Sequence, residues 1–271
     1  MESKELINYM TRNSLNNFAH AIFPIYRFEI GGSPVHIGTC FSIEHHNRKF
    51  LITAAHVIDH YSDDRTLAFA TTSQERLVQV QGEWYVSEAG ELGREEDPID
   101  LALHELTEEE ACKVPAISSS QIEDQAPDES SERMMTIIGF PTSKNKSIKP
   151  TDLSRKRLSP VRVQYADMED VPVSYFEERG MSSRSHVAML RGARSMFDDG
   201  MEDNTIGHRG LSGGPMIFAG LSNSGSPIQP QKVVGVILEQ DERCGVVVAL
   251  RMSEVLRRIE NFFGSRSRPR P

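Results

Sequence analysis

Ser212 lies between glycines in the stretch GHRGLSGGP, residues 207–215. Glycine lets the backbone pass close to a substrate, and the turn would leave the hydroxyl exposed. A serine hydroxyl is a weak nucleophile unless a base takes its proton. The stretch is therefore either a glycine turn with an ordinary serine or, if the chain supplies a base, a nucleophilic site.

The order of the histidines along the chain limits the source of that base. Histidine suits the role near neutral pH, and all 9 histidines precede Ser212. GLSGG formally matches G-x-S-x-G, the nucleophile turn of α/β-hydrolases, but in that fold the histidine follows the serine. The sequence therefore argues against the hydrolase interpretation and predicts an upstream base.

His56 is the best candidate base. It follows an apolar strand and two alanines in FLITAAHVID, and such small residues leave room for an imidazole to face a neighbouring side chain. His60 is expected on a surface turn, and His45 and His46 are expected in a hairpin. His208 is too near Ser212 in the sequence to act as its base.

A third group should hold the imidazole in the correct tautomer. Asp100 begins the alternating stretch DLALHEL, so its apolar neighbours are expected in the core. A carboxylate buried there is costly unless it is paired. Asp97 is the rival, but it precedes a proline in an acidic run that we interpret as solvated. The alternative for Asp100 is a strand-edge cap.

These residues need a scaffold, and short apolar or alternating segments separated by turn residues predict an all-β fold. Residues 2–12 predict a short helix with Leu6, Ile7 and Met10 on one side, and HHNRK predicts a hairpin turn. The predicted organisation is a helical segment 1–17, a first β-barrel 18–117, an acidic linker 118–133, a second β-barrel 134–252, a helix 253–264 and a disordered basic tail 265–271. In the last helix, Ser253 is the predicted N-cap and Leu256, Ile259 and Phe263 share a face.

Composition narrows the class of protein. The 271 residues are 38% hydrophobic, and no run reaches the roughly 18 apolar residues of a membrane span. A net charge of −9 argues against a nucleic-acid binder. The 3 cysteines are widely spaced, form no zinc or disulfide pattern, and predict reduced thiols. The start is polar rather than signal-like, so we expect a cytoplasmic protein. We also expect no membrane partner, no metal and no cofactor.

Three motifs stand in one order: TAAHV, DLAL and GLSGGP. Together they resemble the chymotrypsin/trypsin-like serine proteases over roughly residues 20–262. The resemblance implies a double β-barrel with its active site between the barrels. It also implies that His56 is the general base and acid, that Asp100 orients it, and that Ser212 is the nucleophile. The amides of Gly210 and Ser212 would form the oxyanion hole.

The departures from the family pattern are informative. Leu211 replaces the aspartate that pairs with a newly released amino terminus in digestive members, so we expect no such zymogen activation. Val57 replaces a family cysteine, which leaves Cys40 without a disulfide partner. GTCFSIE and IGHRGLSGGP are similar to segments of the bacterial, HtrA-like branch, and we expect no C-terminal PDZ domain.

The resemblance places the specificity pocket just before the nucleophile and along a later strand. The residues concerned are Ile206, Gly207 and His208, then Ile237, Leu238, Glu239 and Gln240. Ile206 falls where trypsin has its pocket aspartate, so we expect a small or medium apolar side chain to be selected. The alternative is a basic side chain selected from the rim by Glu239 and Asp241.

Two functions follow as hypotheses. The first is a serine endopeptidase acting on protein or peptide substrates, restrained by the acidic loop before Ser212, by narrow specificity or by a regulatory protein partner. The second is a trypsin-fold protein-binding module without catalytic activity. The presence of all three motif residues favours the first.

Overall fold

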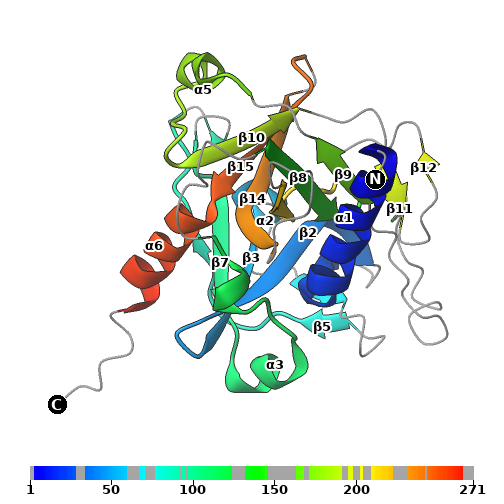
Figure 1. Ribbon diagram of the computed structural model, residues 1–271. Coiled ribbons are helices and arrows are strands. Elements are labelled where there is room, and N and C mark those ends of the chain that lie inside the picture. The colour runs from blue at the N-terminus through cyan, green and yellow to red at the C-terminus, as the bar shows by residue number, and fades with distance from the viewer. Residues whose placement is uncertain are drawn as a thin grey trace.

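The computed structural model describes residues 3–28, 34–59, 67–70, 77–91, 93–94, 97–123, 132–143, 145, 163–167, 171–190, 195–197, 202–203, 209–221, 231–241 and 243–264. Two antiparallel sheets dominate them (Figure 1). No helix in these ranges is long and apolar enough to cross a membrane. The predicted basic tail, 265–271, lies outside the described residues.

The first sheet has seven strands in the order β5-β4-β1-β2-β3-β7-β6. Their bounds are β1 Ile22–Phe28, β2 Pro34–His45, β3 Arg48–Ala54, β4 Leu67–Ala70, β5 Leu77–Gln79, β6 Tyr85–Val86 and β7 Leu101–Glu105. The β2–β3 hairpin turns at His46 and Asn47, both with positive φ (50° and 60°), as a two-residue hairpin of right-handed twist requires. This confirms the hairpin predicted from HHNRK.

The second sheet has eight strands in the order β10-β15-β14-β13-β8-β9-β11-β12. Their bounds are β8 Glu132–Gly139, β9 Val163–Asp167, β10 His186–Leu190, β11 Ser195–Phe197, β12 Glu202–Asp203, β13 Pro215–Leu221, β14 Lys232–Asp241 and β15 Val246–Arg251. The two sheets thus use successive parts of the chain, as the predicted order of strands implied.

The helices flank the sheets. They are α1 Ser3–Phe18, α2 Ala55–Ile58, α3 Glu108–Lys113, α5 Val173–Glu178 and α6 Met252–Phe263, with 3-10 turns at Ala19–Ala21 and Ser119–Gln121. Helices α1 and α6 lie on opposite sides in the view of Figure 1. Helix α1 extends beyond the predicted amphipathic stretch 2–12 and fills the predicted helical segment 1–17 because tertiary packing holds it: Phe18 is fully buried and Met10 O accepts from Gln231 Nε2 over 3.1 Å.

Helix α6 begins one residue before the predicted start. Arg251 is its N-cap and no side-chain cap is present, so Ser253, the predicted cap, lies inside the first turn. The predicted apolar face is confirmed at Ile259 and Phe263, which are buried, whereas Leu256 is only partly buried. The helix is therefore held by burial of one face rather than by its cap.

The predicted acidic linker is not simply a solvated loop. Ile117, just before it, and Ile122 within it are buried, and Ile122 forms a parallel bridge with Val233 of β14. Strand β8 already begins at Glu132, inside the predicted linker. Residues 124–131 lie outside the described part of the chain. Two isoleucines among polar residues are enough to attach this segment to the core.

One apolar core joins the two sheets. It combines residues of the first sheet, of the second sheet and of α6, among them Phe41, Ile52, Ile138, Val236 and Phe263. Smaller cores lie within each sheet. Residues at the ends of β3, β7 and β14 are consequently held in fixed relation to each other.

Candidate active site

His56 and Asp100 are brought together by strand pairing. Strands β3 and β7 are antiparallel, with Ala54 opposite Leu101, so the residues just beyond this pair meet at the same end of the sheet. The Ala55 N–H donates to the Asp100 carbonyl over 2.9 Å. Asp100 has a φ of +39°, a conformation uncommon for a residue with a side chain.

The carboxylate of Asp100 forms two hydrogen bonds with His56. Its Oδ2 lies 2.6 Å from the imidazole Nδ1, and its Oδ1 accepts the His56 main-chain N–H over 2.9 Å. Asp100 is nearly buried, whereas the His56 side chain is 40% exposed. Because a carboxylate only accepts, Nδ1 carries the proton, and in the neutral ring Nε2 keeps its lone pair.

This environment alters the basicity of His56. Burial acts to lower the pKa of the imidazole, but the hydrogen bond and charge of Asp100, with the charge of Asp59, outweigh it, so the pKa is raised. Asp97, the rival carboxylate, is bound elsewhere: it accepts hydrogen bonds from Ser87, Arg94 and the Ile99 N–H. Asp97 is also buried, so the interpretation of its run as solvated is wrong at this residue.

The Ser212 turn packs against the end of β3. Gly213 has a φ of +84°, and a Cβ there would lie 2.1 Å from Thr39 O and 3.0 Å from Ala54 N. The Ser212 carbonyl accepts from the Thr39 N–H over 3.0 Å. The turn that carries the serine thus lies directly against the strand that ends two residues before His56, and only glycine permits this approach.

Within the described residues the Ser212 hydroxyl has no hydrogen-bond partner, and no hydrogen bond joins it to Nε2 of His56. Catalytic hydrogen bonds are often long or poorly aligned in ligand-free structures and tighten only when substrate is bound. The arrangement leaves both the hydroxyl and the lone pair of Nε2 available.

The peptide at Gly210 is held in one orientation. The Arg209 carbonyl accepts from the Thr142 N–H over 2.7 Å, and the Gly210 carbonyl accepts from the Thr39 hydroxyl over 2.7 Å. In a trans peptide the N–H points opposite to the carbonyl, so the Gly210 N–H faces away from Thr142. Within the described residues, neither this amide nor that of Ser212 donates a backbone hydrogen bond.

Gly210 is also fixed sterically. Its φ is +98°, and a Cβ would lie 2.6 Å from Phe140 O and 2.7 Å from Thr142 N. The sequence indicated the glycine but not Thr39 and Thr142, because their role depends on contacts between distant segments. Residues Ile206, Gly207 and His208 of the predicted pocket lie outside the described residues.

The predicted pocket residues of β14 take different positions. Ile237 is buried in the core of the second sheet, and its carbonyl accepts the Gly213 N–H over 2.7 Å. Leu238 is buried in the shared core. Glu239 is half-buried and forms an ion pair with Arg179. The side chain of Gln240 lies outside the description.

A cleft of about 670 Å³ lies beside Asp100. It is lined by residues of the segment before β7 and by residues of the second-sheet half: Gly90, Arg94, Asp97, Pro98, Asp100, Arg179, Gly180, Met181, Leu238 and Glu239. Arg179 bridges Glu239 and Asp241, reaching the latter over 2.8 Å. No motif in the sequence marked Arg94 or Arg179, since isolated arginines in mixed-charge stretches resemble an ordinary surface.

His186 links the second sheet to the segment that carries Asp100. Its Nε2 lies 2.6 Å from Pro98 O, and because a carbonyl only accepts, this nitrogen donates. Nδ1 lies 3.0 Å from the Ser185 hydroxyl. The ring is almost fully buried. Sequence inspection missed this residue because nothing near it in the chain marks it.

Comparison with known proteins supports the fold and no more. A scan against protein-family models and a search of curated proteins both give no match. Among solved structures, an inactivated protease paralogue of the scabies mite, S-D1, superposes with a TM-score of 0.53 and 14% identity, covering 93% of this chain and 95% of that chain.

Two further superpositions are weaker. The VesB protease of Vibrio cholerae gives a TM-score of 0.48 at 14% identity, covering 89% of this chain and 63% of that chain. An inactive form of Rv3671c from M. tuberculosis H37Rv gives 0.46 at 12% identity, covering 97% and 95%. The paralogue and the sheet topology together confirm the predicted fold class: the chain has the all-β, chymotrypsin-like fold with a C-terminal helix.

Proposed function

We propose that the chain is a serine endopeptidase in which Ser212, His56 and Asp100 act together. The observation that carries the proposal is the pair of hydrogen bonds from His56 to Asp100. The turn that contains Ser212 packs against the segment that leads into His56. A protease-like fold alone would not distinguish an enzyme from a binding module. A buried carboxylate that fixes the tautomer of a partly exposed imidazole is an arrangement suited to general-base chemistry.

In the proposed reaction, His56 Nε2 takes the proton of the Ser212 hydroxyl as Oγ attacks the carbonyl carbon of a peptide bond. The resulting oxyanion is held by the amides of Gly210 and Ser212, and loss of one such donor typically costs 10²–10³-fold in kcat. The imidazolium, stabilised by Asp100, returns its proton to the leaving amine as the C–N bond breaks. Water then attacks the acyl-enzyme with His56 again as base, which releases the acid and regenerates Ser212.

The proposed substrates are proteins or peptides with a small or medium apolar side chain at the cleaved residue. The rival idea, a basic side chain selected by Glu239 and Asp241, is weakened because Arg179 already pairs with both carboxylates. Cleavage profiling on a peptide library separates the two, since dominant cutting after Lys or Arg would reject the apolar version.

We further propose that the enzyme works in a reducing, cytoplasmic setting under control of a regulatory protein partner. The three free cysteines, one of them buried, are consistent with that setting. The acidic loop named as a restraint lies largely outside the described residues. Full turnover of casein by the purified chain alone would count against control by a partner.

The second candidate, a trypsin-fold binding module, is favoured by one observation. Within the described residues no hydrogen bond joins Ser212 to His56. The mite paralogue is itself described as inactivated. A fluorophosphonate probe distinguishes the candidates, because it labels a serine only when that serine is activated.

We expect the wild type to be labelled at Ser212 and the Ser212→Ala and His56→Gln variants to remain unlabelled. Labelling should be measured with and without cell extract, so that a need for a partner is not mistaken for inactivity. Absence of labelling in both conditions would support the binding module.

A further inference from the structure

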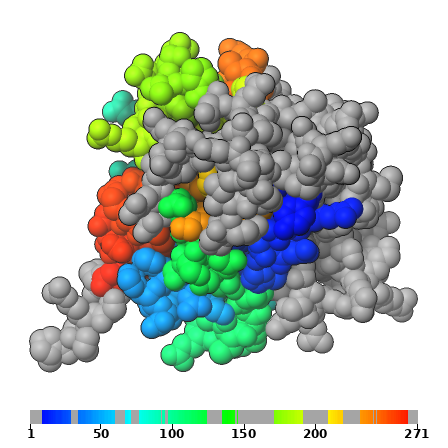
Figure 2. All heavy atoms as spheres, in the orientation of Figure 1, coloured from blue at the N-terminus to red at the C-terminus, as the bar shows by residue number. Residues whose placement is uncertain are grey.

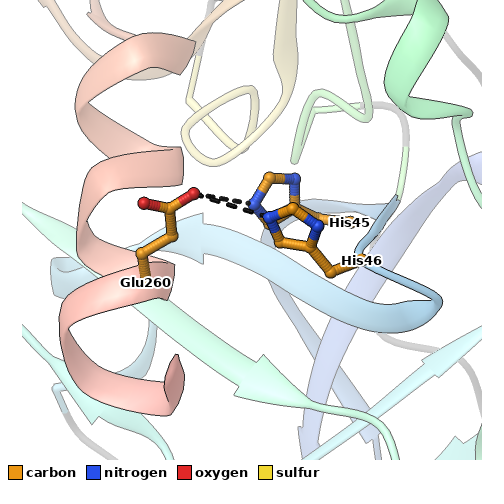
Figure 3. A group of neighbouring side chains, drawn as sticks. All are labelled: His45, His46 and Glu260. Carbon is orange, nitrogen blue, oxygen red and sulfur yellow. Dashed lines mark ion pairs between the residues drawn. The ribbon is translucent and has the colours of Figure 1, made fainter. Parts of the chain in front are cut away.

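Two histidines and a glutamate lie together far from Ser212 in the sequence and on a different part of the fold. His45 is the last residue of β2, His46 is the first residue of the β2–β3 turn, and Glu260 is on α6 (Figure 3). Figure 3 shows both imidazole rings directed toward one carboxylate. Helix α6 and the hairpin lie side by side on the surface (Figure 2).

The backbone of the hairpin explains why neighbouring histidines face the same way. Successive side chains of a regular strand point to opposite faces. His46 has a φ of +50°, which interrupts this alternation. The two ring centroids are consequently only 4.1 Å apart.

The distances suit metal ligands better than hydrogen bonds. Glu260 Oε1 lies 3.5 Å from His45 Nε2 and 3.6 Å from His46 Nε2, which is long for an N–H···O bond. Two ligands held at about 2.1 Å by a tetrahedral zinc ion lie about 3.4 Å apart. All three ligand atoms lie within 4.8 Å of one another.

A second observation also points to a ligand at this position. The Nε2 atom of His45 is buried and has no hydrogen-bond partner within the described residues. The side chain of His45 is 13% exposed, whereas those of His46 and Glu260 are 74% and 60% exposed. A bound ion would satisfy the buried nitrogen, and the exposed side would remain open to a water molecule as the fourth ligand.

We propose that His45, His46 and Glu260 bind a divalent transition-metal ion, and that Zn²⁺ fits this nitrogen and oxygen donor set. Imidazole and carboxylate are common zinc ligands, and three protein ligands with an open fourth position are a known zinc arrangement. The charge of Arg48, which acts on His45, is already paired with Glu105. The ion would cross-link the β2–β3 hairpin to α6.

The test is calorimetric titration of the full chain with ZnCl₂, carried out in a Ser212→Ala background that cannot digest itself. Cys112→Ser and Cys244→Ser remove the exposed thiols, which also bind zinc. We expect one ion per chain and a higher melting temperature with ZnCl₂ than with a chelator, because an ion that binds only the folded state stabilises it.

His46→Ala and Glu260→Gln, both at exposed positions, should each weaken zinc binding by at least about tenfold while leaving the melting temperature in chelator unchanged. His20→Ala, at another exposed histidine, and His56→Gln should leave binding intact. The proposal would be overturned if the parent chain did not bind zinc, or if His46→Ala and Glu260→Gln bound zinc with the same affinity as the parent chain. The result is independent of whether Ser212 is a nucleophile.

Discussion

The Oδ2 atom of Asp100 lies 2.6 Å from Nδ1 of His56, while Oδ1 of the same carboxylate accepts the His56 main-chain N–H. Ring and backbone are therefore fixed by one side chain. The carboxylate determines which ring nitrogen holds the proton, and it also fixes the position of the backbone that carries the ring.

Replacing Asp100 by Asn should impair catalysis far more than folding. The amide keeps the size of the carboxylate but allows the wrong tautomer of His56, so kcat/KM should fall by roughly 10⁴-fold. Asp97→Asn is the matched control, because Asp97 is also buried but binds Ser87 and Arg94 instead of His56. Peptide hydrolysis and thermal unfolding should be measured for both; equal loss of kcat in both variants would contradict the assigned role.

As the pH rises through the pKa of His56, activity should increase and stability should decrease. Its pKa is raised, so the folded state holds the proton more tightly than the unfolded state. This stabilisation is fully present below about pH 6.5, the unfolded value, and is lost as the pH rises through the folded pKa. Over the same window kcat/KM should rise, since the base must be neutral.

The unfolding free energies of the wild type and of Asp100→Asn should be measured by denaturant unfolding at a series of pH values. The difference in unfolding free energy between wild type and variant should shrink as the pH rises through that window. A difference that stays constant with pH would show that the ion pair is not linked to folding.

Gly210→Ala should reduce both stability and catalysis. The φ of +98° is unfavourable for alanine, and its Cβ would meet the backbone at Phe140 O and Thr142 N. The Thr142 hydrogen bond that orients the Gly210 amide should break, with a loss of about 10²-fold or more in kcat. Gly245→Ala controls for backbone strain, since Gly245 has a φ of +66° but open space around it; it should leave kcat unchanged.

His186 is expected to act as a positioning residue for the Asp100 segment. His186→Ala removes the donor to Pro98 O and should lower kcat more than it raises KM, because only the placement of Asp100 is disturbed. His186→Gln can still donate to the carbonyl and should recover part of the loss. Kinetics that show no rescue by glutamine, or a change confined to KM, would reject this role.

His36 should make the protein sensitive to acid. Burial lowers its pKa to about 4, so the neutral ring is favoured by folding. Stability is full above the unfolded value of about 6.5 and falls as the pH drops toward 4, by on the order of 3 kcal/mol. His36→Gln should lose less stability over that interval, as measured by denaturant unfolding at each pH.

The sequence predicted those parts of the site that depend on residue type and order. His56, Asp100 and the glycine turn were predicted together because a nucleophile requires a base and a base requires an orienting group, and the structure brings His56 and Asp100 into contact. Fold class followed from the repeated short apolar segments. The predicted hairpin at HHNRK was correct because its turn chemistry is local.

Features that depend on long-range packing could not be predicted in this way. Thr39 and Thr142 fix the Gly210 peptide from segments distant in the sequence, and His186 reaches Pro98 from the other sheet. Asp97 was interpreted as solvated because its neighbours are charged, yet inside the fold Arg94 neutralises its charge and Ser87 donates a hydrogen bond to it. Helix α1 continues through a polar stretch of low helix propensity because tertiary contacts bury Phe18.

Helix α6 follows the last strand of the second sheet but packs on the first. Its Phe263 ring lies 5.3 Å from that of Phe50, and its Arg258 donates to the Tyr85 hydroxyl. Because both sheets and this helix share one core, neither half can melt while the other keeps its packing. Heat should therefore unfold the chain in a single cooperative transition, and the site between the sheets should be lost only with the whole fold.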